Sequence, residues 1–151
     1  MSSQVLTTQE SIALEAWLRL LRANASMRRS LSAGLDHEHG LAISDFEALL
    51  QLSQAEESAL RRVDLAEGLG LTASGVTRLL DGLEAAGLVG KRTCESDARV
   101  TYAVLTEAGR AKLAEASCSH VAAIRALFEE RYTPEELETL ASLLARLPGA
   151  E

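Results

Sequence analysis

The sequence is poor in aromatic residues, cysteine and proline. Aromatic side chains make up 3% of the 151 residues, and there are two prolines and two cysteines. So few aromatic rings argue against a binding pocket built mainly by ring stacking. Cys94 and Cys118 lack metal-ligand spacing, so we expect reduced thiols, no metal site and no cofactor.

Long apolar runs are also missing. No stretch is long and apolar enough to span a bilayer, and the first residues, MSSQVLTTQES, lack the basic and apolar blocks of a signal peptide. Hydrophobic residues make up 47% and charged residues 25%, as in an ordinary globular protein. We therefore expect a single domain, residues 1–151, that is located in the cytoplasm and has no membrane partner.

Catalytic patterns are absent as well. The three histidines, His37, His39 and His120, have no nucleophile–base spacing, and there is no phosphate-binding glycine loop or paired-carboxylate motif. His37 and His39 flank Glu38, but one H-E-H segment is weak evidence for a metal site. The sequence therefore argues against an enzyme and against a metal sensor.

The net charge is acidic, and its distribution is uneven. The formal charge of −7 by itself disfavours a nucleic-acid partner. Between Arg61 and Lys112, however, eight basic residues stand against seven acidic ones, which gives this segment +1 and leaves −8 for the rest of the chain. The charge of the middle segment therefore permits nucleic-acid binding without demonstrating it.

Capping patterns and apolar periodicity predict long helices at both ends of the chain. Three hydroxyl–carboxylate pairs have the spacing of a capping box: Thr7 with Glu10, Ser44 with Glu47, and Thr133 with Glu136. We expect terminal helices within 8–33 and 107–147, with apolar faces wider than a small core needs. A second copy of the chain is the simplest cover for these faces, so we expect them to be dimerisation helices.

The middle of the chain, residues 44–105, has shorter elements. Apolar periodicity predicts three helices, over 45–54, 62–69 and 73–86. Alternating residues predict strands over 88–93 and 100–105, and the polar segment CESDA between them predicts a hairpin turn. Helix, tight turn, helix and hairpin together form a winged helix-turn-helix. The expected fold is mainly α with a small β-hairpin wing.

Residues 60–109 resemble the MarR family of bacterial transcription regulators. The resemblance rests on LRRVDLAEGLGLTASGVTRLLDGLEAAGLVGKR, on CESDARVTYAVLTEAGR, and on flanking helices of fitting length. It implies a homodimer that binds a palindromic operator in double-stranded DNA, usually as a repressor released by a small aromatic ligand. The wing departs from the family at Ala98, where members commonly have a second arginine.

The predicted helix 73–86 and the wing supply the expected DNA contacts. A recognition helix needs small and polar residues on the face opposite its packed one. The expected contacts are Thr72, Ser74, Gly75, Thr77, Arg78, Arg92 and Arg99. Arg78 suits a bidentate contact with guanine, and Arg99 suits a narrow minor groove. The alternatives for Arg78 are a solvated side chain or a pair with Asp81. The resemblance implies that Asp97 supports the wing by orienting an arginine.

The effector and two alternative functions stay open. Trp17, His39 and Phe46 are the candidates for the effector pocket that the resemblance implies, and packing or surface positions are the alternative for each. One alternative function is a dimeric winged-helix module that binds a protein partner. The other is a thiol-based redox regulator that uses Cys94, near basic residues that would stabilise a thiolate. Cys118 is expected to be buried.

Overall fold

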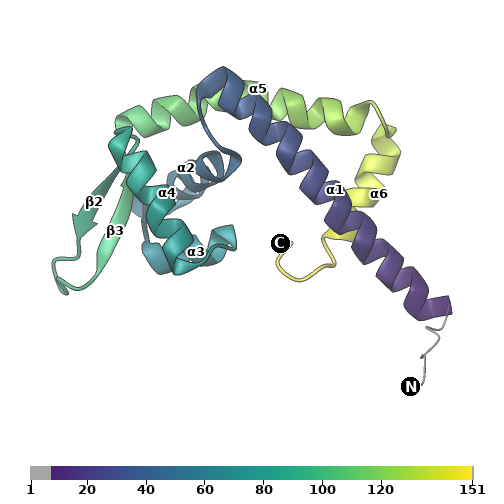
Figure 1. Ribbon diagram of the computed structural model, residues 1–151, viewed down its shortest axis with the longest axis horizontal. Coiled ribbons are helices and arrows are strands. Elements are labelled where there is room, and N and C mark those ends of the chain that lie inside the picture. The colour runs from purple at the N-terminus through teal and green to yellow at the C-terminus, as the bar shows by residue number, and fades with distance from the viewer. Residues whose placement is uncertain (1–7, 151) are drawn as a thin grey trace.

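The computed structural model describes residues 8–150, with ten elements of secondary structure (Figure 1). In chain order they are α1 (Thr8–His39), α2 (Ile43–Gln54), the short 3-10 helix η1 (Glu56–Ser58), β1 (Ala59–Arg61), α3 (Arg62–Leu69), α4 (Ala73–Ala85), β2 (Val89–Thr93), β3 (Thr101–Leu105), α5 (Glu107–Glu129) and α6 (Pro134–Leu144). None of the helices in this part of the chain has the length and apolar content needed to cross a membrane.

The elements fall into a lobe and a set of outer helices. Helices α2 to α4 and the sheet gather on one side of the molecule, and α5 runs from this lobe across to α6 (Figure 1). The C-terminal part of α1 packs on α5, and the N-terminal part of α1 extends away from the lobe (Figure 1). The first half of α1 therefore lies outside the core of the lobe.

The sheet has three antiparallel strands in the order β1-β3-β2. Strands β2 and β3 form the predicted hairpin, with Val89 opposite Leu105 and Thr93 opposite Thr101. The short strand β1 adds to the other edge of β3. Val89 and Leu105 are buried, so the base of the hairpin is anchored in the core, while its tip extends from the lobe.

The apolar stripe of α4 is buried in the centre of the lobe. Val76, Leu80 and Leu83 are at most 3% exposed and pack in one cluster with residues of α2 and α3 such as Leu49 and Leu65. This spacing of three and four residues is the one that the sequence predicts for an amphipathic helix. The fold class, mainly α with a small wing, is confirmed.

Side chains and glycines fix several helix ends. The predicted capping box at Thr133 is present: its hydroxyl accepts from Glu136 N (3.2 Å), and the Glu136 carboxylate accepts from Thr133 N (2.9 Å). The Thr72 hydroxyl likewise accepts from Gly75 N (3.1 Å) and starts α4. Gly87 has a φ of +74°, which favours glycine and allows the chain to turn from α4 into β2.

The predicted end of the first helix is wrong. Helix α1 continues past residue 33 to His39 and ends before Gly40, whose φ is +66°. Leu35 is buried in the core of the lobe at 3% exposure. Burial of this last apolar turn against the lobe stabilises helix beyond the stretch that local pattern indicated.

One predicted capping box is also wrong. Ala42, not Ser44, precedes the first turn of α2, and the Asp45 carboxylate accepts from Ala42 N (3.0 Å). Glu47 instead accepts two hydrogen bonds from Arg28 of α1, at 2.6 and 3.1 Å. A tertiary ion pair has therefore taken the carboxylate that the local pattern assigned to a cap. The box predicted at Thr7 lies outside the described residues.

We predict that Gly109→Ala destabilises the protein. Gly109 lies at the start of α5, and a Cβ there would overlap the carbonyl oxygen of Leu88 and lie 2.7 Å from Leu105 Cδ1. Overpacking of this kind costs about 1–3 kcal/mol. Gly82→Ala is the matched control, because no atom lies within 4 Å of its Cβ position and the helical substitution should add about 0.5–1 kcal/mol. Urea unfolding at equal protomer concentration measures both, and equal stability of the two variants would contradict the prediction.

His120 of α5 is buried against Phe46 of α2, with ring centroids 4.5 Å apart. Its Nδ1 has no hydrogen-bond partner among the described residues. Burial lowers the pKa of His120 below its ordinary value of 6.5, and the charge of Glu47 opposes that shift. The folded chain therefore binds a proton at this ring less readily than the unfolded chain.

We predict that stability falls as the pH drops from 7 to 5, in part through His120. The pKa of His120 is lower in the folded state, so the unfolded state binds the proton first as the pH falls. Protonation therefore stabilises the unfolded state relative to the folded state below pH 6.5. The melting temperature of the His120→Gln variant should fall less over this pH range than that of the wild type, because glutamine does not titrate. Identical losses for the two proteins would show that His120 does not contribute.

Candidate nucleic-acid interface

The first turns of α4 present a small, polar and exposed surface. Thr72 and Ser74 are exposed, with their hydroxyl oxygens 3.3 Å apart. The Thr77 hydroxyl donates to the Ala73 carbonyl (2.9 Å) and accepts from Arg62 of α3 (3.3 Å). Burial of the opposite stripe of α4 forces this outward orientation. Small residues here allow close approach of another surface, such as the edges of bases in a groove.

Arg78 is the exposed cation of this surface. No hydrogen bond or ion pair joins its side chain to any residue in the described part of the chain. The pair with Asp81 that was the alternative at this position is therefore not formed. The guanidinium keeps its donors available for a planar acceptor pair such as the edge of guanine.

Arg99 and Asp97 form a compact unit in the loop between β2 and β3. The Asp97 carboxylate accepts from the Arg99 backbone N (3.0 Å) and from its side-chain Nε (3.2 Å). These bonds lower the pKa of Asp97. The Arg99 side chain is still 91% exposed. Asp97 thus holds an exposed arginine in one orientation at the wing.

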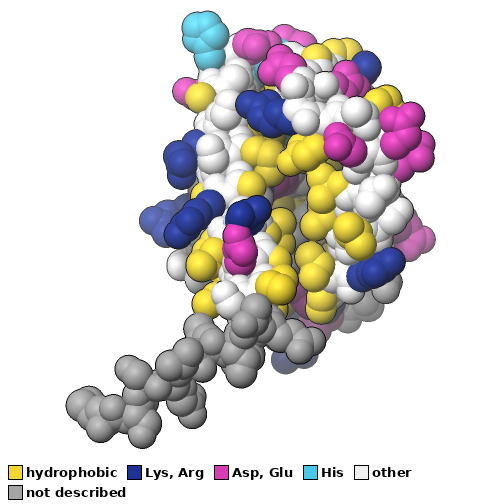
Figure 2. All heavy atoms as spheres, turned by 90° about the vertical axis from the view of Figure 1, so that its right-hand side faces the viewer, with side chains coloured by type: hydrophobic (Ala, Val, Ile, Leu, Met, Phe, Trp, Pro, Cys, Tyr) yellow, Lys and Arg dark blue, Asp and Glu magenta, His cyan; other side chains and the backbone are white. Residues whose placement is uncertain are grey.

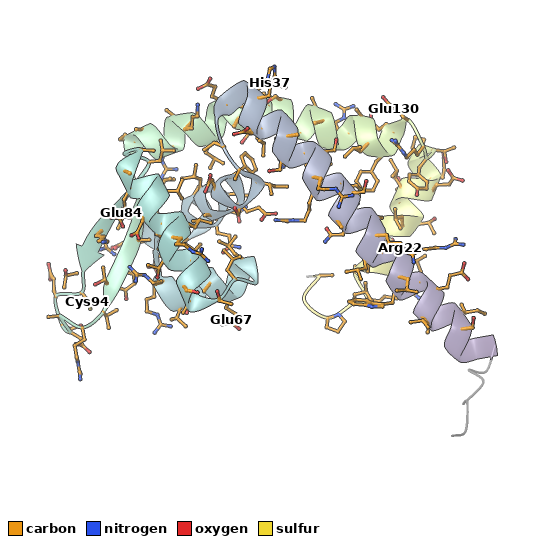
Figure 3. The ribbon with its side chains drawn as sticks, in the orientation of Figure 1. Arg22, His37, Glu67, Glu84, Cys94 and Glu130 are labelled. Carbon is orange, nitrogen blue, oxygen red and sulfur yellow. The ribbon has the colours of Figure 1, made fainter. Side chains whose placement is uncertain are left out.

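The two cations of β2 point to different partners. Arg92 binds Glu57 (2.8 Å) and lies over the Tyr102 ring, 5.5 Å from its centroid. Lys91 binds Glu84 of α4 (3.3 Å), which lies between the helix and β2 (Figure 3). The structure therefore brings Lys91, which is not among the expected DNA contacts, to the α4 side and ties Arg92 to η1. Alternation along the strand predicts this divergence, but only the fold decides which residue faces α4.

The three candidates for an effector pocket are not brought together. Trp17 is 58% exposed and lies 22 residues before His39, about 33 Å along α1. The His39 ring binds Ser119 (2.7 Å), and Phe46 is buried against His120. A cavity of about 270 Å³ does lie between α1 and α5, but none of the three lines it. In the single chain Trp17 is a surface position and Phe46 a packing position, and the effector pocket stays a prediction.

Neither the two cysteines nor the three histidines belong to a cluster of metal-binding side chains among the described residues. The Cys94 thiol lies 3.1 Å from the Ser96 hydroxyl, and hydrogen bonds from Ser96 and from the Asp97 backbone lower the pKa of this thiol. Cys118 is exposed, so its predicted burial is wrong. His37 projects from the end of α1, and no three metal-binding side chains cluster anywhere in residues that the structure describes (Figure 3).

The segments described above are similar to known proteins. The model of the MarR family matches residues 39–100, which run from the last residue of α1 through β2 and end in the wing loop just before β3. The chain is 32% identical over 108 residues to the HTH-type transcriptional repressor YetL of Bacillus subtilis (strain 168), which covers 72% of this chain and 64% of that protein's length.

Two solved structures extend the similarity to nearly the whole chain. AbsC, a MarR family transcriptional regulator from Streptomyces coelicolor, is 33% identical, with a TM-score of 0.79 over 94% of this chain and 93% of AbsC. Sco3205, a MarR family regulator from the same organism solved in complex with DNA, is 27% identical, with a TM-score of 0.80 over 94% of this chain and 87% of Sco3205. Sequence and fold agree over almost the full length, so the chain belongs to the MarR family.

Proposed function

We propose that the protein is a homodimeric transcriptional repressor that binds a palindromic operator in double-stranded DNA. The observation that carries the proposal is the exposed Arg78 on a small polar helix surface, together with an exposed Arg99 on the wing. The DNA complex of the similar Sco3205 supports DNA as the partner, and the similarity to the repressor YetL supports repression.

Helix α4 would enter the major groove. Ser74 and Gly75 let the backbone come close to the groove floor, while Thr72 and Thr77 contact the flanking phosphates. Arg78 would then donate two hydrogen bonds to one guanine, a contact worth about 1–3 kcal/mol of discrimination against other bases.

The wing would lie along the adjacent minor groove. Arg99 enters a narrow groove, where the negative potential is strongest. Asp97 keeps the guanidinium oriented before binding, so less side-chain freedom is lost on contact. In the free chain the Arg92 guanidinium binds Glu57 and lies over the Tyr102 ring, so its predicted contact with DNA would require DNA to replace Glu57.

A second copy of the chain would cover the exposed apolar residues of the outer helices. Hydrophobic side chains gather along both sides of a hollow on the side where α1 begins (Figure 2). The large exposed ones on the outer helices and their connections are Ile12, Leu14, Trp17, Leu20, Leu21, Val121, Tyr132, Leu143 and Leu147. Patches of this kind usually mark a protein interface. A symmetric dimer would place two α4 helices one helical turn of DNA apart, as a palindrome requires.

We predict that the wild type selects a palindromic motif from a random duplex library at moderate salt, and that Arg78→Ala with Arg99→Ala abolishes the selection. The two changes remove the proposed base contact and the proposed minor-groove contact. Sequencing of the bound duplexes before and after selection provides the measurement. Arg125→Ala is the control for loss of a surface arginine, because it removes a positive charge from α5 outside the DNA-binding lobe.

Two results would count against the proposal. Enrichment of the same motif by the double variant would refute the assigned contacts. A folded dimer that enriches no duplex would instead favour a winged-helix module that binds a protein partner.

We predict that the dimer depends on the apolar surface of α6. Removal of residues 133–151 should leave a monomer, and Leu143→Glu should weaken the dimer by introducing a charge at a residue that is 49% exposed in the single chain. Ser142→Glu is the matched control, since it adds the same charge at the neighbouring exposed position. Sedimentation equilibrium measures the result. A Leu143→Glu protein that dimerises as tightly as the control would place the interface elsewhere.

A further inference from the structure

A basic concavity lies between the start of α3 and the wing. Its volume is about 470 Å³, and its lining includes Arg61, Arg62, Lys91 and Arg99, together with Val63 and Val100. All the residues of this lining are in the described part of the chain, and four are basic and none is acidic. A concave surface with this composition favours an anionic ligand.

The four cations differ in how far they are already neutralised. Three carry an ion pair with a carboxylate of the same chain: Arg61 with Asp64, Lys91 with Glu84, and Arg99 with Asp97. Arg61 is the most tightly held, through bonds of 2.7 and 2.9 Å. Arg62 contacts only the Thr77 hydroxyl among the described residues, at 3.3 Å. Arg62 is therefore the lining cation whose charge is most available to a ligand.

The contact with Thr77 connects the concavity to the exposed surface of α4. Arg62 is the first residue of α3, and its side chain donates to the Thr77 hydroxyl. Thr77 directly precedes Arg78, which is proposed to read a base. In a duplex, the phosphates form the rim of the groove that the helix enters. A duplex seated on α4 therefore brings part of its backbone to the side where Arg62 lies. Guanidinium and phosphate form strong charge-assisted hydrogen bonds.

We propose that this concavity binds a backbone phosphate of the duplex held on α4, with Arg62 as the principal ligand and Lys91 as the second cation. The inference rests on the proposed DNA-binding function and adds a contact outside the recognition helix. Arg62 anchors the strand without reading sequence, while Arg78 reads a base. The carboxylates that hold the other cations keep the surface nearly neutral until DNA arrives.

The test measures the salt dependence of DNA binding by the full-length dimer. Each neutralised phosphate contributes about 0.9 to the magnitude of the slope of log K against the logarithm of the salt concentration. Loss of one phosphate contact in each protomer should therefore reduce that magnitude by about 1.8. Arg62→Gln should therefore bind the selected operator and a scrambled duplex more weakly by the same factor. Its deficit relative to wild type should shrink roughly tenfold between 50 and 200 mM salt.

Two variants control for charge and for structure. Arg62→Lys keeps the positive charge at the same place and should retain most of the slope. Arg125→Gln removes one positive charge from α5 and should leave the slope unchanged. Circular dichroism and sedimentation confirm that each variant is folded and dimeric before binding is compared.

A second measurement separates backbone phosphate from free phosphate. The Nε–H resonance of Arg62 should shift on addition of the operator duplex and stay in place with 10 mM inorganic phosphate at matched ionic strength. Saturation by inorganic phosphate alone would make the concavity a small-anion site and refute the DNA assignment.

The outcomes distinguish this inference from the function on which it rests. An unchanged slope for Arg62→Gln, with normal binding by the wild type, would refute the proposed contact between Arg62 and a backbone phosphate and leave DNA binding intact. A lower ratio of operator to scrambled affinity in Arg62→Gln would mean that Arg62 reads bases, which also refutes that contact. A wild type that binds no duplex would overturn both.

Discussion

The whole interface depends on the burial of one stripe of α4. Val76, Leu80 and Leu83 pack into the core of the lobe, and each lies at most 3% exposed. Because a helix has 3.6 residues per turn, burial of this stripe leaves the short polar residues and Arg78 no orientation except outward. The wing is built on the same core through Val89 and Leu105, so the helix and the wing keep a constant spacing.

Intramolecular ion pairs would reconcile the acidic net charge of the protein with the proposed DNA partner. Several cations of the lobe are paired with nearby carboxylates, as in Lys91 with Glu84 and Arg99 with Asp97, whereas Arg62 and Arg78 carry no such pair among the described residues. Exposed pairs of this kind contribute little to stability, so a phosphate can replace a carboxylate at small cost. The affinity would then come from a few available cations and from counterion release, and would depend strongly on salt.

The junction of α1, α2 and α5 links the outer helices to the lobe. Arg28 of α1 binds Glu47 of α2, and His39 at the end of α1 binds Ser119 of α5. His120 packs on Phe46 between these contacts. A part-buried ion pair, a hydrogen bond and a ring contact restrain relative movement more than apolar packing alone. In a dimer held by the outer helices, this junction would set the distance between the two recognition helices.

Local chemistry in the sequence determined most of the fold. The helix periodicity of α4, the threonine cap at Thr133 and Gly87 with positive φ act within a few residues, so they are visible in the chain. Contacts between distant residues were decided only by the tertiary structure. Helix α1 extends to His39 because the lobe buries Leu35, and Glu47 leaves its predicted cap because Arg28 reaches it from another helix. The same holds at the interface, where Arg78 follows from periodicity, whereas the grouping of Arg62, Lys91 and Arg99 around one concavity arises from the way the hairpin folds back beside α3.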